Sequence, residues 1–183
     1  MNTVEMAFQE AGHVVMTLLW GVWRVDKVSI VGRGNSGGSI EYSSVREMEG
    51  EEPWQRFGTR VFDAKLEQMM GAPVALAIQS GSEVVYQGDT GDSDFNCVVR
   101  VIQDDIPGGS LADAWVVILE HEPKVQADLK RMWPVVEALS QELIAKQELS
   151  DYEIRSIVRG AVNRLPENER TWAISRLRNM SPL

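Results

Sequence analysis

Apolar residues recur at helical spacing at the start of the chain and again over most of its second half. From Val4 to Trp20 they fall three or four positions apart without an intervening proline, which predicts a helix. Ser150 to Glu153 has the spacing of a capping box and predicts another helix through Val162. The same spacing predicts further helices over residues 54–70, 74–87, 95–102, 111–121, 123–146 and 167–180.

One stretch between these helices has the pattern of paired strands. Val25, Val28 and Ile30 precede the glycine-rich segment 32–38, and Ser39 to Tyr42 follows it. The order strand, turn, strand predicts a small hairpin. We therefore expect an α+β fold, mainly α, with a small β-hairpin or sheet next to the first helix.

The length of the chain sets the expected number of domains. With 183 residues, the chain is long enough for one hydrophobic core and short for two. We expect a single domain over residues 1–183. The longest predicted helix contains Pro134, which is expected to kink or split it.

Composition and charge narrow the function classes. The sequence is 44% hydrophobic and 25% charged, and no apolar run approaches the ~18 residues that a membrane span needs. The N-terminus lacks the basic region and apolar stretch of a secretory signal, so the expected location is cytoplasmic. A net charge of −9 argues against nucleic acid as a partner, because phosphate binding needs clustered Lys and Arg.

The supply of metal ligands is small. Cys97 is the one cysteine, so neither an internal disulfide nor a cage of several cysteines can form. The two histidines are His13 and His121. Any metal must therefore bind through His, Asp or Glu.

The candidate chemistry lies in the first predicted helix, at Gln9-Glu10-Ala11-Gly12-His13. In the zinc-peptidase pattern H-E-x-x-H, the two histidines lie one helical turn apart and bind the same metal ion. The glutamate between them takes a proton from the metal-bound water. Here Glu10 and His13 occupy the positions of the base and the second ligand, and Gln9 occupies the position of the first.

Other segments of the chain accompany this motif. Phe8 and Val14-Val15 flank it directly. After it come a predicted strand with an Arg-Gly turn (25–34), a glycine-containing helix (77–88), a Thr-Gly loop (90–95) and a closing helical segment (136–154). Over residues 5–160 the chain resembles the protease domain of the FtsH-type zinc metallopeptidases.

The resemblance implies a role for three side chains. Glu10 would be the general base, His13 a zinc ligand, and Asp94 the acidic ligand that the Thr-Gly loop supplies. That loop is one residue shorter than the family pattern, which leaves Asp92 as a substitute for Asp94 and Asp89 as a weaker one.

Gln9 changes what the resemblance implies about activity. Its neutral amide oxygen is a much poorer zinc ligand than imidazole. We expect a zinc endopeptidase-like domain that binds unfolded polypeptide, with weakened zinc binding and weak or lost hydrolysis. The alternative is a noncatalytic pseudoprotease that acts as a peptide-binding or scaffold module. No Walker sequence occurs, so the family's ATPase would have to be a separate partner, and a homo-oligomer stays open.

Other interpretations of the same residues remain. Taken alone, Glu10 and His13 could be a surface glutamate and a buried core histidine. His121 could complete a metal site, but its place between Glu120 and Glu122 is more typical of a partly exposed residue at a helix end. Cys97 could face the site or pack in the core.

Overall fold

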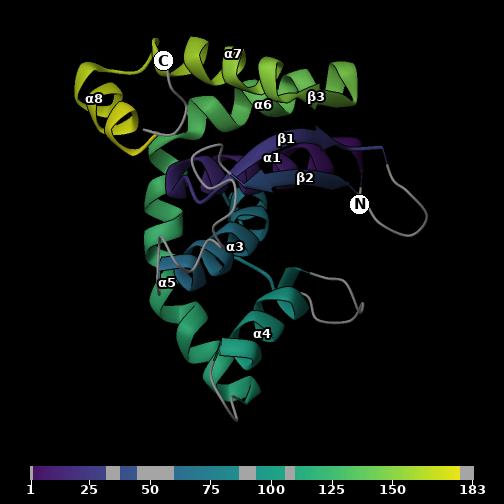
Figure 1. The fold of residues 1–183 in the computed structure, drawn as a ribbon, viewed down its shortest axis with the longest axis vertical. Coiled ribbons are helices and arrows are strands. Elements are labelled where there is room, and N and C mark those ends of the chain that lie inside the picture. The colour runs from purple at the N-terminus through teal and green to yellow at the C-terminus, as the bar shows by residue number, and fades with distance from the viewer. Residues whose placement is uncertain (1, 32–37, 45–59, 87–93, 106–109, 178–183) are drawn as a thin grey trace.

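The protein is mainly helical, with a small antiparallel sheet, as the sequence predicts. The computed structural model describes residues 2–31, 38–44, 60–86, 94–105 and 110–177. Figure 1 shows the sheet beside α1, with α6 and α7 at one end of the molecule and α4 at the other. The helices are α1 (Thr3–Trp20), α3 (Arg60–Ser80), α4 (Asp94–Asp105), α5 (Leu111–Arg131), α6 (Trp133–Lys146), α7 (Asp151–Val162) and α8 (Glu167–Arg176).

The sheet contains the predicted hairpin and one additional strand. β1 (Trp23–Ser29) pairs antiparallel with β2 (Ser39–Ser44), which confirms the hairpin. β3 (Glu148–Ser150) pairs antiparallel with the other side of β1, so the strand order is β2-β1-β3. The sequence does not predict β3, because its three residues contain a single buried apolar side chain, Leu149.

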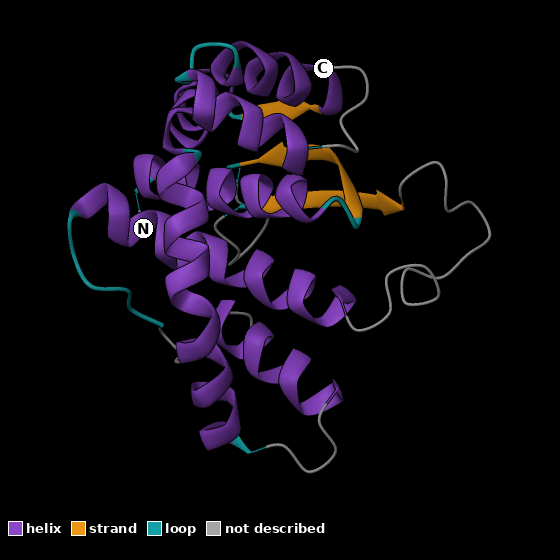
Figure 2. Cartoon of the chain, turned by 90° about the vertical axis from the view of Figure 1, so that its left-hand side faces the viewer, coloured by secondary structure: helices purple, strands orange, loops and turns teal. Residues whose placement is uncertain are grey.

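Helix α1 lies at the centre of the fold. It packs against α3 and α6 and also contacts β1 and α5. Its side chains from Ala11 to Leu19 are buried, and the strands lie on one side of the helical body (Figure 2). Among the described residues, no helix combines the length and apolar character that a membrane span requires.

Helix α3 corrects one predicted boundary. The sequence predicts separate helices over 54–70 and 74–87, but one helix runs from Arg60 to Ser80 and contains Pro73. A proline inside a helix removes one hydrogen bond, here the one to the carbonyl of Met69. The predicted break lies between these two helices, at Gly71 and Pro73. Both residues are buried within the helix. Packing of this segment against α1 offsets their low helix propensity, so the helix continues.

The boundary between α5 and α6 is also displaced from the predicted position. The sequence predicts a break at Glu122, whereas α5 continues through Pro123 to Arg131. Helix α6 then begins at Trp133 with Pro134 in its first turn, where a proline has no helical hydrogen bond to lose. Pro134 therefore splits the predicted long helix rather than kinking it.

Candidate functional site

Helix α1 carries the Glu10–His13 pair and has well-defined ends. Asn2 and Glu5 form a reciprocal capping box, in which the Asn2 side chain accepts from the backbone N–H of Glu5 at 2.9 Å. Gly21 ends the helix in the left-handed conformation with φ 61°, as expected for a helix C-cap. Because Glu10 and His13 are three positions apart on a regular helix, their side chains lie on one face.

Two glycines bring α1 and α3 together next to His13. A Cβ atom on Gly12 would collide with the backbone carbonyl of Gly71, and it would come within 2.7 Å of the Cβ of Ala75. A Cβ on Gly71 would in turn lie 2.7 Å from the carbonyl oxygen of Gly12. The two backbones therefore touch at this crossing. The contact places His13 against the preceding turn of α3.

His13 is held at a fixed orientation in this crossing. Its side chain is buried, and Nδ1 donates a hydrogen bond to the backbone carbonyl oxygen of Gln68 at 2.7 Å. A carbonyl oxygen can only accept, so Nδ1 carries the hydrogen. In the neutral form of the ring, the lone pair is then on Nε2. Histidines that bind metals are commonly oriented in this way, with one ring N–H on a backbone carbonyl or carboxylate.

Glu10 is buried and lies against the start of β2. It is 9% exposed, so the interpretation of a surface glutamate is wrong. A Cβ atom on Gly38, the residue just before β2, would collide with the carboxylate of Glu10. Glycine at this position therefore allows the strand to approach the carboxylate. The structure brings the candidate base and the edge of the sheet together.

The remaining predicted ligands are only partly described. Gln9 is half-buried beside Glu10 on α1. Asp94 is the first residue of α4, but its side chain lies outside the described part of the structure, as do Asp92 and Asp89 altogether. Within the described residues, no group of three His, Cys, Asp or Glu side chains is arranged to hold a metal ion.

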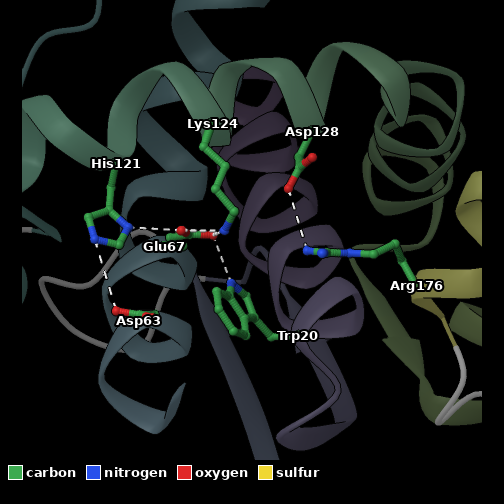
Figure 3. Close-up of polar contacts among 7 residues, drawn as sticks. All are labelled: Trp20, Asp63, Glu67, His121, Lys124, Asp128 and Arg176. Carbon is green, nitrogen blue, oxygen red and sulfur yellow. Dashed lines mark hydrogen bonds and ion pairs between the residues drawn. The ribbon is translucent and has the colours of Figure 1, made fainter. Parts of the chain in front are cut away.

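His121 belongs to a different cluster, centred on Glu67 (Figure 3). The Glu67 side chain is 1% exposed and accepts from Nδ1 of His121 at 2.9 Å and from Nε1 of Trp20 at 2.8 Å. Nζ of Lys124 donates to both of its carboxylate oxygens. Nε2 of His121 lies 4.0 Å from the carboxylate of Asp63. His121 is therefore a partly buried residue within α5, not a helix-end residue as predicted.

Hydrogen bonding sets the charges in this cluster. Burial alone would raise the pKa of Glu67, but its hydrogen bonds from His121, Lys124 and Trp20 hold that pKa below the ordinary value. The bond to Glu67 raises the pKa of His121, against the opposing effect of burial. The carboxylate and the imidazolium thus stabilise each other.

The sequence does not predict the role of Glu67, because no local pattern indicates that this residue is buried in a polar cluster. Its partners Trp20, His121 and Lys124 lie 47, 54 and 57 positions away along the chain. A glutamate within a predicted helix is typical of a solvated surface. Only the packing of α1, α3 and α5 shows that this one is buried.

The fold and the site together define a class: a mainly helical α+β protein with a buried Glu–His pair on its central helix. No protein-family model matches the chain, and no curated protein matches it.

Proposed function

We propose that this chain is a degenerate zinc metalloendopeptidase-like domain, related to the FtsH-type peptidases, that binds unfolded polypeptide and hydrolyses it weakly or not at all. The observation that supports this most strongly is the geometry of α1. Glu10 and His13 are both buried on one face, and a backbone carbonyl orients the His13 ring through Nδ1, which leaves Nε2 as the nitrogen that would bind a metal.

The position of β2 supports polypeptide as the substrate class. Among the described strands, β2 is at one edge of the sheet, and the residue before it contacts Glu10. An extended peptide can add to such an edge through backbone hydrogen bonds. A peptide bound there would pass close to the carboxylate that the proposal assigns as general base.

The proposal assigns the weakened metal site to three side chains. His13 has the orientation of a ligand, Gln9 would offer an amide oxygen, and Asp94 would be the acidic ligand. When bound, zinc would polarise a carbonyl and acidify a water molecule. Glu10 would accept a proton in such a site. The amide at position 9 accounts for the expected loss of affinity, since neutral amide oxygens bind zinc poorly.

Gln9 also favours the second candidate, a noncatalytic pseudoprotease that serves as a peptide-binding or scaffold module. In this case the edge of β2 would bind peptide without metal. A separate ATPase partner or self-assembly would be compatible with either candidate.

Restoring the first ligand separates the two candidates. We expect Gln9→His to raise zinc affinity by about a hundredfold over the natural sequence, because one imidazole replaces a poor ligand. Zinc content after dialysis would be measured by elemental analysis, and cleavage would be measured with unfolded casein, with and without a chelator. Cleavage by Gln9→His alone would identify a decayed enzyme.

The matched control is the double variant Gln9→His with Glu10→Gln, which keeps the restored ligand and removes the base. It should bind zinc like Gln9→His and cleave no casein. Chelator-sensitive cleavage by the natural sequence would show that the enzyme is still active. Absence of zinc from all three proteins would contradict the proposed site.

A further inference from the structure

The surface has a cleft that is separate from the Glu10–His13 pair. It is a cleft of about 820 Å³ between α5, the C-terminal part of α3 and the segment Gly81–Tyr86. Its lining is mainly apolar, and the rings of Tyr86 and Trp115 meet edge to face with centroids 5.9 Å apart. Gln9, Glu10 and His13 are not among the lining residues. The proposed peptidase site therefore does not account for this cleft.

A stripe of exposed apolar side chains runs along α5 beside the cleft. Leu111, Trp115 and Leu119 are 53%, 38% and 64% exposed, and they recur every four residues. This spacing gives a continuous row about 12 Å long on one side of the helix. Val85 and Val116, 61% and 56% exposed, widen it. Clustered exposed apolar residues of this kind mark a surface that another molecule covers.

The border of this stripe is acidic. The segments 81–86 and 110–123 contain Glu83, Asp113, Glu120 and Glu122 and have no Lys or Arg. The next cation along α5, Lys124, is bound to Glu67. Lys130 lines the cleft further toward the C-terminal end of α5. The stripe thus combines an apolar centre with negative edges.

The acidic border favours some kinds of binding partner for this surface over others. Anionic lipid surfaces and nucleic acids would meet like charge. A second copy paired through the same face would bring two acidic borders together, which is unfavourable. The four-residue repeat on α5 matches the spacing along one face of a partner helix, which packs ridge into groove. We propose that the cleft binds an amphipathic helix of a partner protein, with its apolar face on α5 and Lys or Arg along its edges.

Synthetic peptides test the proposal on the full chain. One peptide of about 18 residues would carry Leu at helical spacing with Lys elsewhere, a second would have the same composition scrambled, and a third would have Glu in place of Lys. Binding would be measured by fluorescence anisotropy of the labelled peptides. We expect the first peptide to bind at least about tenfold more tightly than the other two, and more weakly as salt increases.

Variants of exposed residues link any binding to this surface. Leu119→Ser should weaken binding about tenfold, and so should the double charge reversal Glu83→Lys with Glu120→Lys. Ile174→Ser on α8 is the matched control, because Ile174 is also exposed, at 45%, and should leave binding unchanged. Circular dichroism would check that every variant is folded.

Four results would overturn the proposal. They are no binding of the basic amphipathic peptide, equal binding of the acidic or scrambled peptide, full binding by Leu119→Ser, and binding lost equally in Ile174→Ser. Sedimentation of the chain with phosphatidylserine vesicles, or self-association abolished by Leu119→Ser, would assign the surface to a lipid or to a second copy instead.

Discussion

Glu67 shows how much one buried carboxylate can depend on its neighbours. The side chain is almost fully buried, and it accepts hydrogen bonds from Trp20, His121 and Lys124. Transfer of an unpaired carboxylate into a protein interior is strongly unfavourable, so these donors are needed for the charge to persist. Lys124 also stacks over the Trp20 ring, 4.5 Å from its centroid. The aromatic ring and the carboxylate together position the cation.

Removing Glu67 should therefore destabilise the protein substantially. We expect Glu67→Ala to lower the free energy of unfolding by about 3 kcal/mol, because it leaves the ring N–H groups of Trp20 and His121 without their acceptor and Lys124 without its anion. Glu137→Ala on the exposed side of α6 should change it by less than about 0.5 kcal/mol. Urea denaturation of both variants measures the difference. Equal effects of the two substitutions would show that the cluster contributes no net stability.

At the scale of single residues, the sequence predicts what depends on local spacing. The placement of Glu10 and His13 on one helical face follows from their separation of three positions. The orientation of the His13 ring could not be predicted, because the acceptor is a backbone carbonyl 55 positions away. Glu67 and His121 were unpredictable for the same reason.

At the scale of elements, the crossing of α1 and α3 depends on two residues without side chains. Gly12 and Gly71 each occupy a place where a Cβ atom would meet the backbone of the other helix. Glycine inside a helix costs about 0.5–1 kcal/mol relative to alanine, so the close approach must compensate for that cost at both positions. The crossing also positions Gln68 and His13.

Adding a methyl group at this crossing should push the helices apart. We expect Gly12→Ala to lower the free energy of unfolding by about 2 kcal/mol or more, since backbone atoms cannot rotate away from the added carbon. Gly160→Ala on α7 is the control, because the nearest atom to its added Cβ would be at 3.7 Å, in the side chain of Arg164. That substitution should raise stability by about 0.5–1 kcal/mol. Thermal unfolding that shifts in the same direction for both variants would contradict this explanation.

The predicted elements agree with the structure where the local sequence pattern and the tertiary contacts favour the same conformation. The hairpin and the helix that follows the Ser150 capping box are both confirmed. The predicted break near Gly71 and Pro73 is wrong, because burial against α1 keeps α3 continuous. Glycine and proline are reliable breakers only where tertiary contacts do not offset their cost.

At the scale of the whole molecule, polar clusters join helices that are distant in the sequence. Glu67 links α3 to the end of α1 through Trp20 and to α5 through His121 and Lys124. The carboxylate of Asp128 on α5 lies 3.7 Å from the guanidinium of Arg176, at the end of α8 (Figure 3). The first cluster contains a histidine, so its contribution to stability depends on pH.

The pH dependence follows from the shifted pKa values of Glu67 and His121. Glu67 has a lowered pKa, so its contribution is present above about pH 4.5 and is lost as pH falls through the folded-state value. His121 has a raised pKa, so its contribution is present below about pH 6.5 and is lost as pH rises through the folded-state value. Both contributions are therefore complete between about pH 4.5 and 6.5.

Comparison of the natural sequence with His121→Gln isolates this effect. The difference in unfolding free energy should be largest between about pH 5 and 6.5 and should shrink toward pH 9, as His121 becomes neutral. Urea denaturation across this range measures it. A difference that stays constant from pH 5 to 9 would mean that His121 is not charged in the folded protein.

The hydrogen bond from His13 to the main chain at position 68 has a consequence for how such a protein changes over generations. Every amino acid supplies the same carbonyl oxygen, so mutations that replace the side chain at that position leave the acceptor in place. Mutation of the side chain at position 68 therefore leaves the orientation of the His13 ring unchanged. If the proposed metal site is correct, a histidine introduced at position 9 would find the second histidine already oriented.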